Sequence, residues 1–274
     1  LVENCKKTTD EGWKFVRFGL LETHDAVKTD QTTYKNPGIL EPTESVKLTT
    51  EQFAKIRDAV GDDINICLDV HTRLDTAHVI DLCKRLEEFN PFFIEDPLRS
   101  ESPHAYRNLS KHTSLPIAAG EQWSSKWQFR QVIEEDLINY ARIDFCIAGG
   151  ITESKKITNW AETHYIDIVP HNPLGAISAA ACVSLCMAST NVGVQEMPKR
   201  PGTIANDIFP VGRSAALARD HVVQVQVAPV KHFTAVLAGV FVALKNIVPC
   251  KLHLLLGKPI VPQEQDHARN PQTK

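Results

Sequence analysis

An α/β barrel of parallel strands with crossover helices is the fold that the sequence predicts. Between residues 12 and 196 a short apolar run repeatedly ends in a polar residue and is followed by a longer stretch with helical periodicity. Such alternation is typical of parallel strands joined by helices. Seven strands in a row favour a barrel over a doubly wound sheet, although periodicity alone does not exclude the doubly wound fold. The predicted strands are residues 13–19, 64–69, 92–95, 116–120, 138–144, 166–170 and 192–195.

The helices expected between these strands have similar lengths. They are residues 51–60, 77–89, 103–111, 126–135, 153–164 and 176–188, preceded by a helix within residues 1–12. Residues 20–47 are long and polar, with a Pro37–Gly38 pair, and we expect a functional or disordered loop there. The pattern stops after Glu196. We therefore expect a barrel domain over residues 1–200 and a divergent segment over residues 201–274, partly apolar and disordered at its end.

Composition narrows the class of protein. A chain of 274 residues holds one large α/β domain or two ordinary ones. The formal charge of −3, with no block of Lys or Arg, predicts no nucleic-acid partner. The most apolar stretches, residues 233–244 and 247–256, are too short and interrupted to span a membrane. The first twelve residues lack a signal peptide, and the seven cysteines form no CxxC pair, so we expect reduced thiols and a cytoplasmic location.

The strongest functional signal is the polar residue that closes each apolar run. Asp69, Glu95, Glu121, Asp144, His171 and Glu196 follow one another at intervals of 23 to 27 residues. Each interval is one strand and helix, so the six residues are expected at the carboxyl ends of successive strands. Barrel enzymes keep their chemistry at this end.

Asp69, Glu95 and Glu121 come from three consecutive strands. Three carboxylates at one mouth repel one another unless a cation lies among them, and oxygen ligands with room for water and substrate suit Mg²⁺. The alternative is that these acids only cap strands and start helices, which fits three residues in register less well than a single one.

Histidines provide the second part of the predicted site. Asp144 and His171 lie at the ends of adjacent strands, where a carboxylate orients an imidazole as a general base. His71 lies two residues after Asp69, so its side chain is expected on the same side. Glu196 is expected to bind a substrate hydroxyl or to hold a histidine.

Several strand-end motifs resemble the enolase superfamily, and within it the mandelate racemase-like sugar-acid dehydratases. The resemblance runs from about residue 5 to about residue 200. It rests on DVHTRLD, FIEDPLRSE, PIAAGEQW, INYARIDFCIAGGITESKKI, PHNPLGAISAAA and VQE, in the order of the family. It implies an enolase-like (β/α)7β barrel, Mg²⁺ bound by Asp69, Glu95 and Glu121, and Glu196 near the substrate. The activity it implies is dehydration of an aldonate such as mannonate, galactonate or gluconate to a 2-keto-3-deoxy acid.

Two kinds of relative imply different bases. IDFCIAGGITE and PHNPLG resemble galactonate dehydratases, in which His171 and Asp144 would form the base and His71 the acid. DVHTRL, Arg142, and Arg17 followed by a TTY loop resemble mannonate dehydratases, in which Arg17 and Tyr34 would form the base. Arg142 is expected to bind substrate. We favour His171 as base and His71 as acid.

The ends of the chain differ from the family pattern. Residues 1–12 resemble the helix before the second barrel strand, so we expect neither a capping domain nor a first strand, an incomplete barrel, and two exposed sheet edges. Residues from about 216 onward do not resemble the family, and residues 233–244 are a candidate cover for the open edge. Family membership also implies a homo-oligomer. The alternatives are a racemase or cycloisomerase on the same site, and a catalytically impaired remnant that acts as a binding protein.

Overall fold

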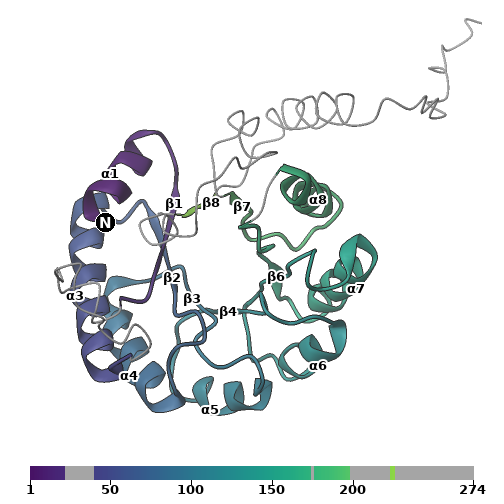
Figure 1. The fold of residues 1–274 in the computed structure, drawn as a ribbon, viewed down its shortest axis with the longest axis horizontal. Helices are drawn as coiled ribbons and strands as arrows, with labels where there is room; N and C mark the ends of the chain where they lie inside the picture. Colours follow the sequence, from purple (N-terminus) through teal and green to yellow (C-terminus); the bar gives the residue numbers. More distant parts are fainter. Residues whose placement is uncertain (22–39, 174–175, 198–222, 226–274) are drawn as a thin grey trace, which may run out of the picture.

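A computed structural model describes residues 1–21, 40–173, 176–197 and 223–225. Tyr34, most of the predicted polar loop and the apolar stretch 233–244 lie outside the described residues. The described part forms an eight-stranded sheet rolled into a ring, with helices around its outside (Figure 1). The predicted α/β barrel is confirmed.

Six strands in chain order form the parallel part of the sheet, each hydrogen-bonded to the next. They are β1 (Phe15–Gly19), β2 (Asn65–Asp69), β3 (Phe93–Glu95), β4 (Ile117–Ala119), β5 (Tyr140–Ala141) and β6 (Asp167–Ile168). Each matches a predicted strand, with shorter bounds. Parallel pairing brings all six carboxyl ends to one mouth of the ring.

The ring is closed by two further strands. β7 (Glu196–Met197) and β1 both pair antiparallel with β8 (Val223–Val225). A parallel bridge between Ile168 and Val192 links β6 to the residues just before β7. The two sheet edges that we expected to be exposed are therefore paired, and the strand that pairs with them comes from the segment after residue 200.

The helices lie where the sequence predicts them, with one clear exception. They are α1 (Val2–Asp10), α3 (Pro42–Val60), α4 (Thr76–Leu86), α5 (Tyr106–Leu109), α6 (Lys126–Glu134), α7 (Gly150–Glu162) and α8 (Ala176–Met187), with 3₁₀ turns Glu87–Phe89 and Pro103–Ala105. No helix within the described ranges has the length and apolar character needed to cross a membrane.

The exception is α3, which begins nine residues before the predicted start. Glu41 is its N-cap, and a carboxylate oxygen of Glu41 accepts a hydrogen bond of 2.7 Å from the backbone N–H of Glu44. Pro42 occupies the first turn, where a missing N–H costs nothing. Residues 42–47, predicted as loop, are therefore helical.

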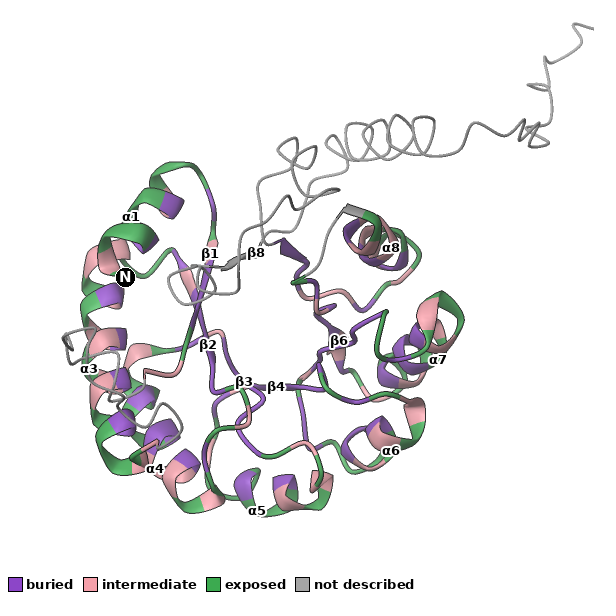
Figure 2. Cartoon of the chain, in the orientation of Figure 1, coloured by how far each residue is buried: buried purple, intermediate pink, exposed green. Residues whose placement is uncertain are grey.

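Side-chain alternation along the strands produces two apolar layers, seen as buried strands in Figure 2. Outward-facing Ile66, Leu68 and Ile94 belong to the large core between sheet and helices. The inward-facing set forms a separate cluster inside the ring, made of Cys67, Phe93, Ala118, Val169 and Val194. Because the inward positions that follow Cys67, Phe93 and Val194 are the carboxylates Asp69, Glu95 and Glu196, this apolar cluster forms the floor of the candidate site.

Candidate metal and proton-transfer site

The six predicted strand-end residues do lie together above the apolar cluster. Asp69 and Glu95 are register partners on β2 and β3, and Asp144 and His171 form a parallel bridge between the ends of β5 and β6. Glu121 follows β4 after one residue, and Glu196 begins β7. All five carboxylates are buried. The structure therefore brings together the side chains that the spacing of the sequence placed at one mouth.

Arg17 occupies the middle of these carboxylates. Its Nη2 donates to Asp69 Oδ2 and to Glu95 Oε1, both at 2.8 Å, and its Nε donates to Glu95 Oε2 at 2.5 Å. Nη1 lies 3.5 Å from Glu196 Oε1, and Nη2 lies 3.8 Å from Glu121 Oε2. Burial by itself lowers the pKa of Arg17, but Asp69, Glu95 and Glu196 raise it well above its usual value. Arg17 therefore keeps its proton.

Arg142 is the second buried arginine and lies beneath the carboxylates. Its Nε donates to Glu95 Oε1 at 2.8 Å, Nη2 to Glu196 Oε2 at 2.7 Å, and Nη1 to the carbonyl of Val169 at 3.0 Å. The side chain is fully buried. The guanidinium is thus fully engaged with the protein. This geometry does not support the predicted substrate contact. Arg142 instead holds the carboxylates of Glu95 and Glu196 in place.

Each arginine lowers the pKa of the carboxyl groups it contacts. Burial raises the pKa of Glu95 and of Glu196, but Arg142 and Arg17 outweigh it and hold both pKa values below the usual range. Glu121 lacks such a partner, and burial, followed by the charges of Glu95, Asp96 and Asp69, raises its pKa to about 10. The protein therefore stabilises the ionised form of Glu121 much less than that of Glu95 or Glu196.

The His171–Asp144 pair has the geometry predicted for a general base. Nδ1 of His171 lies 2.8 Å from Asp144 Oδ2. The other oxygen, Asp144 Oδ1, accepts the backbone N–H groups of Cys146 at 2.7 Å and Ile147 at 3.0 Å. Burial raises the pKa of Asp144, but the bond to His171 and these N–H groups lower it on balance. Asp144 Oδ2 accepts the Nδ1–H of His171, which leaves Nε2, 3.2 Å from Glu121 Oε2, as the acceptor nitrogen of the ring.

His71 lies on the other side of Glu121. Its Nδ1 is 3.4 Å from Asp69 Oδ2 and 3.3 Å from Glu121 Oε1. The backbone at His71 has φ 53°, an uncommon left-handed conformation for a non-glycine residue. Hydrogen bonding to Asp69 raises the pKa of His71. Its side chain is half exposed, which suits a proton donor that meets a substrate from the mouth.

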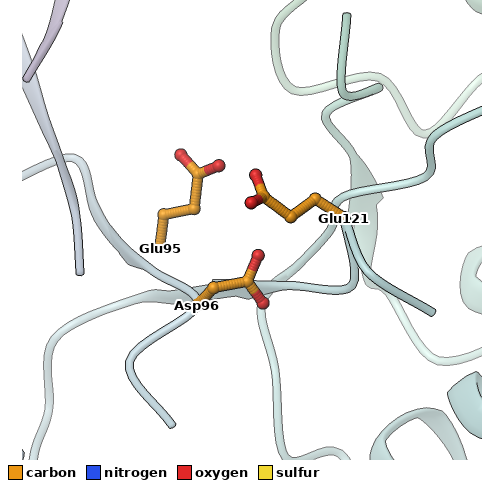
Figure 3. Close-up of side chains that lie close together, drawn as sticks. All are labelled: Glu95, Asp96 and Glu121. Atoms are coloured by element: carbon orange, nitrogen blue, oxygen red, sulfur yellow. The ribbon is translucent and has the colours of Figure 1, made fainter. Parts of the chain in front are cut away.

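One acidic residue of the site, Asp96, was given no role on the basis of the sequence. Asp96 directly follows Glu95, and strand alternation places it on the opposite face. In the structure Glu95, Asp96 and Glu121 each offer an oxygen within 4.8 Å of the other two, and all three are buried (Figure 3). Burial, followed by the charge of Glu95, raises the pKa of Asp96 to about 7. The FIEDP sequence contains this residue, but only the backbone conformation shows that it faces the site.

The donor set fits a hard divalent cation. Every candidate ligand atom is a carboxylate oxygen, as Mg²⁺ prefers. Seven buried side-chain oxygens in the described part of the chain have no hydrogen-bond partner, and three of them are carboxylate oxygens of the site: Asp69 Oδ1, Asp96 Oδ2 and Glu121 Oε2. Unpaired buried oxygens are costly, and a cation shared among them removes that cost. The fit therefore rests on free oxygens as well as on charge.

Fold and site together define a β/α barrel with an acidic mouth and a His–Asp pair. The model of the enolase C-terminal domain-like family matches residues 1–229, and the chain belongs to this family. Its similarity to D-galactonate dehydratase of Ralstonia pickettii (strain 12J) is 38% identity over 159 residues, which covers 58% of this chain and 42% of that protein.

Solved structures agree with this assignment. A candidate dehydratase from Salmonella Typhimurium superposes with a TM-score of 0.67 at 27% identity, covering 75% of this chain and 52% of that one. A mandelate racemase/muconate lactonizing enzyme-like protein from Rubrobacter xylanophilus DSM 9941 superposes with a TM-score of 0.63 at 25% identity. The match covers 71% of this chain and 48% of that one. The chain spans about half the length of the relatives it matches.

Proposed function

We propose that this chain is the barrel of a magnesium-dependent sugar-acid dehydratase. The reaction removes the proton on the carbon next to a carboxylate and eliminates the β-hydroxyl as water, which yields a 2-keto-3-deoxy acid. The observation that carries the proposal is the His171–Asp144 pair, with 2.8 Å between Nδ1 and Oδ2, at the rim of a buried carboxylate cluster. The named D-galactonate dehydratase relative makes an aldonate the first substrate class to test.

The two histidines have complementary positions for proton transfer. His171 donates its Nδ1–H to Asp144, which leaves the Nε2 lone pair to accept the α-proton. His71 has a raised pKa and an exposed ring, so it donates a proton to the departing hydroxyl, which leaves as water. Mg²⁺ held by Asp69, Glu95 and Glu121 would stabilise the negative charge that develops on the substrate carboxylate.

The competing base, the predicted Arg17–Tyr34 pair, has weaker support. Tyr34 lies outside the described residues, and the guanidinium of Arg17 makes three hydrogen bonds to Asp69 and Glu95. An arginine held among carboxylates does not release its proton near neutral pH. Arg17 therefore acts as a positioning residue for the carboxylates in this proposal.

The proposal is tested by incubating purified protein and Mg²⁺ with galactonate, mannonate and gluconate and following 2-keto acid formation. His171→Asn should abolish product formation. His164→Asn is the matched control, because His164 pairs with Asp136 at the same 2.8 Å but lies at the far end of α7. Isotope exchange or epimerisation without a 2-keto acid would instead indicate a racemase, and ligand binding without turnover a binding protein.

A further inference from the structure

Glu95 and Asp96 are consecutive residues whose carboxyl groups face the same side. In a regular strand neighbouring side chains point to opposite faces. Asp96 has φ +35°, outside the extended region, and this backbone turn brings its side chain toward Glu121 (Figure 3). Positive φ is uncommon for a residue other than glycine and marks a conformation that the surrounding structure must hold.

The two oxygens of Asp96 have different environments. Oδ1 accepts a 3.0 Å hydrogen bond from the backbone N–H of Gly120, the residue before Glu121. Oδ2 is buried and has no hydrogen-bond partner, and Asp96 as a whole is only 3% exposed. Oδ1 thus ties the end of β3 to the end of β4, while Oδ2 is left free within the acidic cluster.

The arginines satisfy only one member of this cluster. A carboxylate has about four lone-pair positions, and Glu95 already accepts three hydrogen bonds from Arg17 and Arg142. Asp96 accepts none from the described arginines, and Arg17 comes only within 3.8 Å of Glu121. The carboxyl groups that have a free oxygen and accept no hydrogen bond from an arginine are therefore Asp96 and Glu121, where a cation gains most.

We propose that Asp96 is a direct ligand of the divalent cation, which takes oxygens of Glu95, Asp96 and Glu121. This inference deepens the proposed function and rests on its magnesium site, but it adds a ligand that the strand-end pattern does not contain. Asp69, whose Oδ2 is bonded to Arg17 at 2.8 Å, contributes through its free Oδ1. The ligand chemistry is that of a hard, oxygen-bound ion such as Mg²⁺ or Mn²⁺.

The competing explanation is that Asp96 only anchors Gly120. Asp96→Asn separates the two roles. An asparagine carbonyl still accepts the N–H of Gly120, whereas its amide nitrogen cannot bind a cation. Asp75→Asn is the matched control, because it makes the same chemical change at the N-cap of α4, where asparagine also caps.

Binding of Mg²⁺ and of Mn²⁺ is measured by calorimetry on the full chain, with folding checked by circular dichroism. We expect Asp96→Asn to weaken affinity by more than about 10- to 100-fold, the range for groups that only support a ligand, and Asp75→Asn to leave it unchanged. Should the amide variant not fold, Asp96→Ser is measured in its place, since a hydroxyl still accepts from Gly120 but is a poor ligand.

Eu³⁺ luminescence lifetimes in H₂O and D₂O provide a second readout. They count bound waters, and loss of one protein oxygen should add about one water in the variant. Wild-type affinity and water number in Asp96→Asn would overturn this inference and leave the proposed function standing, provided that Glu121→Gln loses the metal. A wild-type protein that binds neither Mg²⁺ nor Mn²⁺ would overturn both.

Discussion

Single residues of the site differ chiefly in whether an arginine contacts them. Glu95 and Glu196 are bonded to Arg142, and their pKa values fall despite complete burial. Glu121 and Asp96 have no such bond, and burial raises their pKa values to about 10 and about 7. The protein itself thus compensates the lower part of the carboxylate cluster. Under the proposed function, a cation would stabilise the ionised forms of Glu121 and Asp96.

Asp144→Asn tests whether His171 depends on its carboxylate. The amide cannot hold the Nδ1 proton as an anion does, so the base loses its tautomer and orientation. We expect kcat to fall by about 10²- to 10⁴-fold with KM little changed, measured by steady-state 2-keto acid formation. Asp136→Asn, at the equivalent pair with His164, should leave kcat within about twofold of wild type. An equal loss in both variants would count against the base assignment.

The sequence was enough to predict which strand-end residues lie together, but not the positions of Arg17 and Asp96. Regular spacing was enough to group Asp69, Glu121 and His171, because one strand and one helix per interval fixes the end of the barrel where each lies. The central place of Arg17 was not predictable, since it depends on side-chain contacts across strands. Asp96 was missed because the alternation rule holds only for extended backbone, and its positive φ has no signature in sequence.

Among the helices, N-terminal capping explains why the start of α4 lies close to its predicted position and why the start of α3 does not. The sequence gives α4 a clear start, where Asp75 accepts the N–H of His78 at 3.0 Å. The start of α3 was missed because Glu41 is an unusual N-cap, whose longer side chain still reaches the N–H of Glu44. Asp and Ser are favoured at this position for their short reach.

The cap of α4 leads to a pH-dependent prediction. Bonding to the His78 N–H lowers the pKa of Asp75, so its contribution to stability is complete above its usual pKa and is lost as pH falls through the lowered value. Asp75→Ala should lower the free energy of unfolding by about 1 kcal/mol at pH 7, measured by urea denaturation. That difference should shrink below about pH 4. Asp75→Asn also lacks the titrating carboxyl, so the difference in stability between the two variants should stay constant with pH, and a constant deficit of Asp75→Ala relative to wild type would contradict the capping role.

Gly120, which follows β4, is a position where an added side chain would clash with neighbouring side chains. It has φ +127°, and an added Cβ would lie 2.4 Å from one ring carbon of Phe129 and 2.6 Å from another. Gly61 is a control for backbone strain alone, because it has φ +76° and no atoms within 4 Å of an added Cβ. We expect Gly120→Ala to cost about 1–3 kcal/mol more than Gly61→Ala, measured by the same denaturation. Equal costs would show that the ring of Phe129 yields easily.

The whole molecule closes its ring in a way that local patterns could not indicate. Seven strands follow from the repeated rhythm of apolar run and helix. The eighth strand, β8, pairs antiparallel with β1 and β7, so it does not belong to the repeated pattern of strand and helix from which the other strands were predicted. The family match, which extends to residue 229, includes this strand, whereas the resemblance seen in the sequence motifs ends near residue 200. Non-local pairing of this kind depends on the completed ring.

Metal binding and protonation should be linked across the whole molecule. The raised pKa values of Glu121 and Asp96 mean that the metal-free native state binds more protons than the unfolded state above about pH 4.5, the usual value for Glu. Stability should therefore fall as pH rises, through about pH 7 for Asp96 and on toward about pH 10 for Glu121. His71, whose pKa is also raised, adds a loss of stability of the same sign as pH rises from its usual pKa of about 6.5 through the raised value.

Thermal unfolding between pH 5 and pH 8 in a chelator should accordingly show a falling Tm. The carboxyl groups with lowered pKa values, such as Glu95 and Asp144, are ionised in both states over this range and contribute almost no slope. Saturating Mg²⁺ should flatten the decline because the cation replaces the bound proton. Glu121→Gln should show a shallower decline in chelator, since it cannot ionise, and little response to Mg²⁺. A steep decline that persists in Glu121→Gln would place the linked proton on another group.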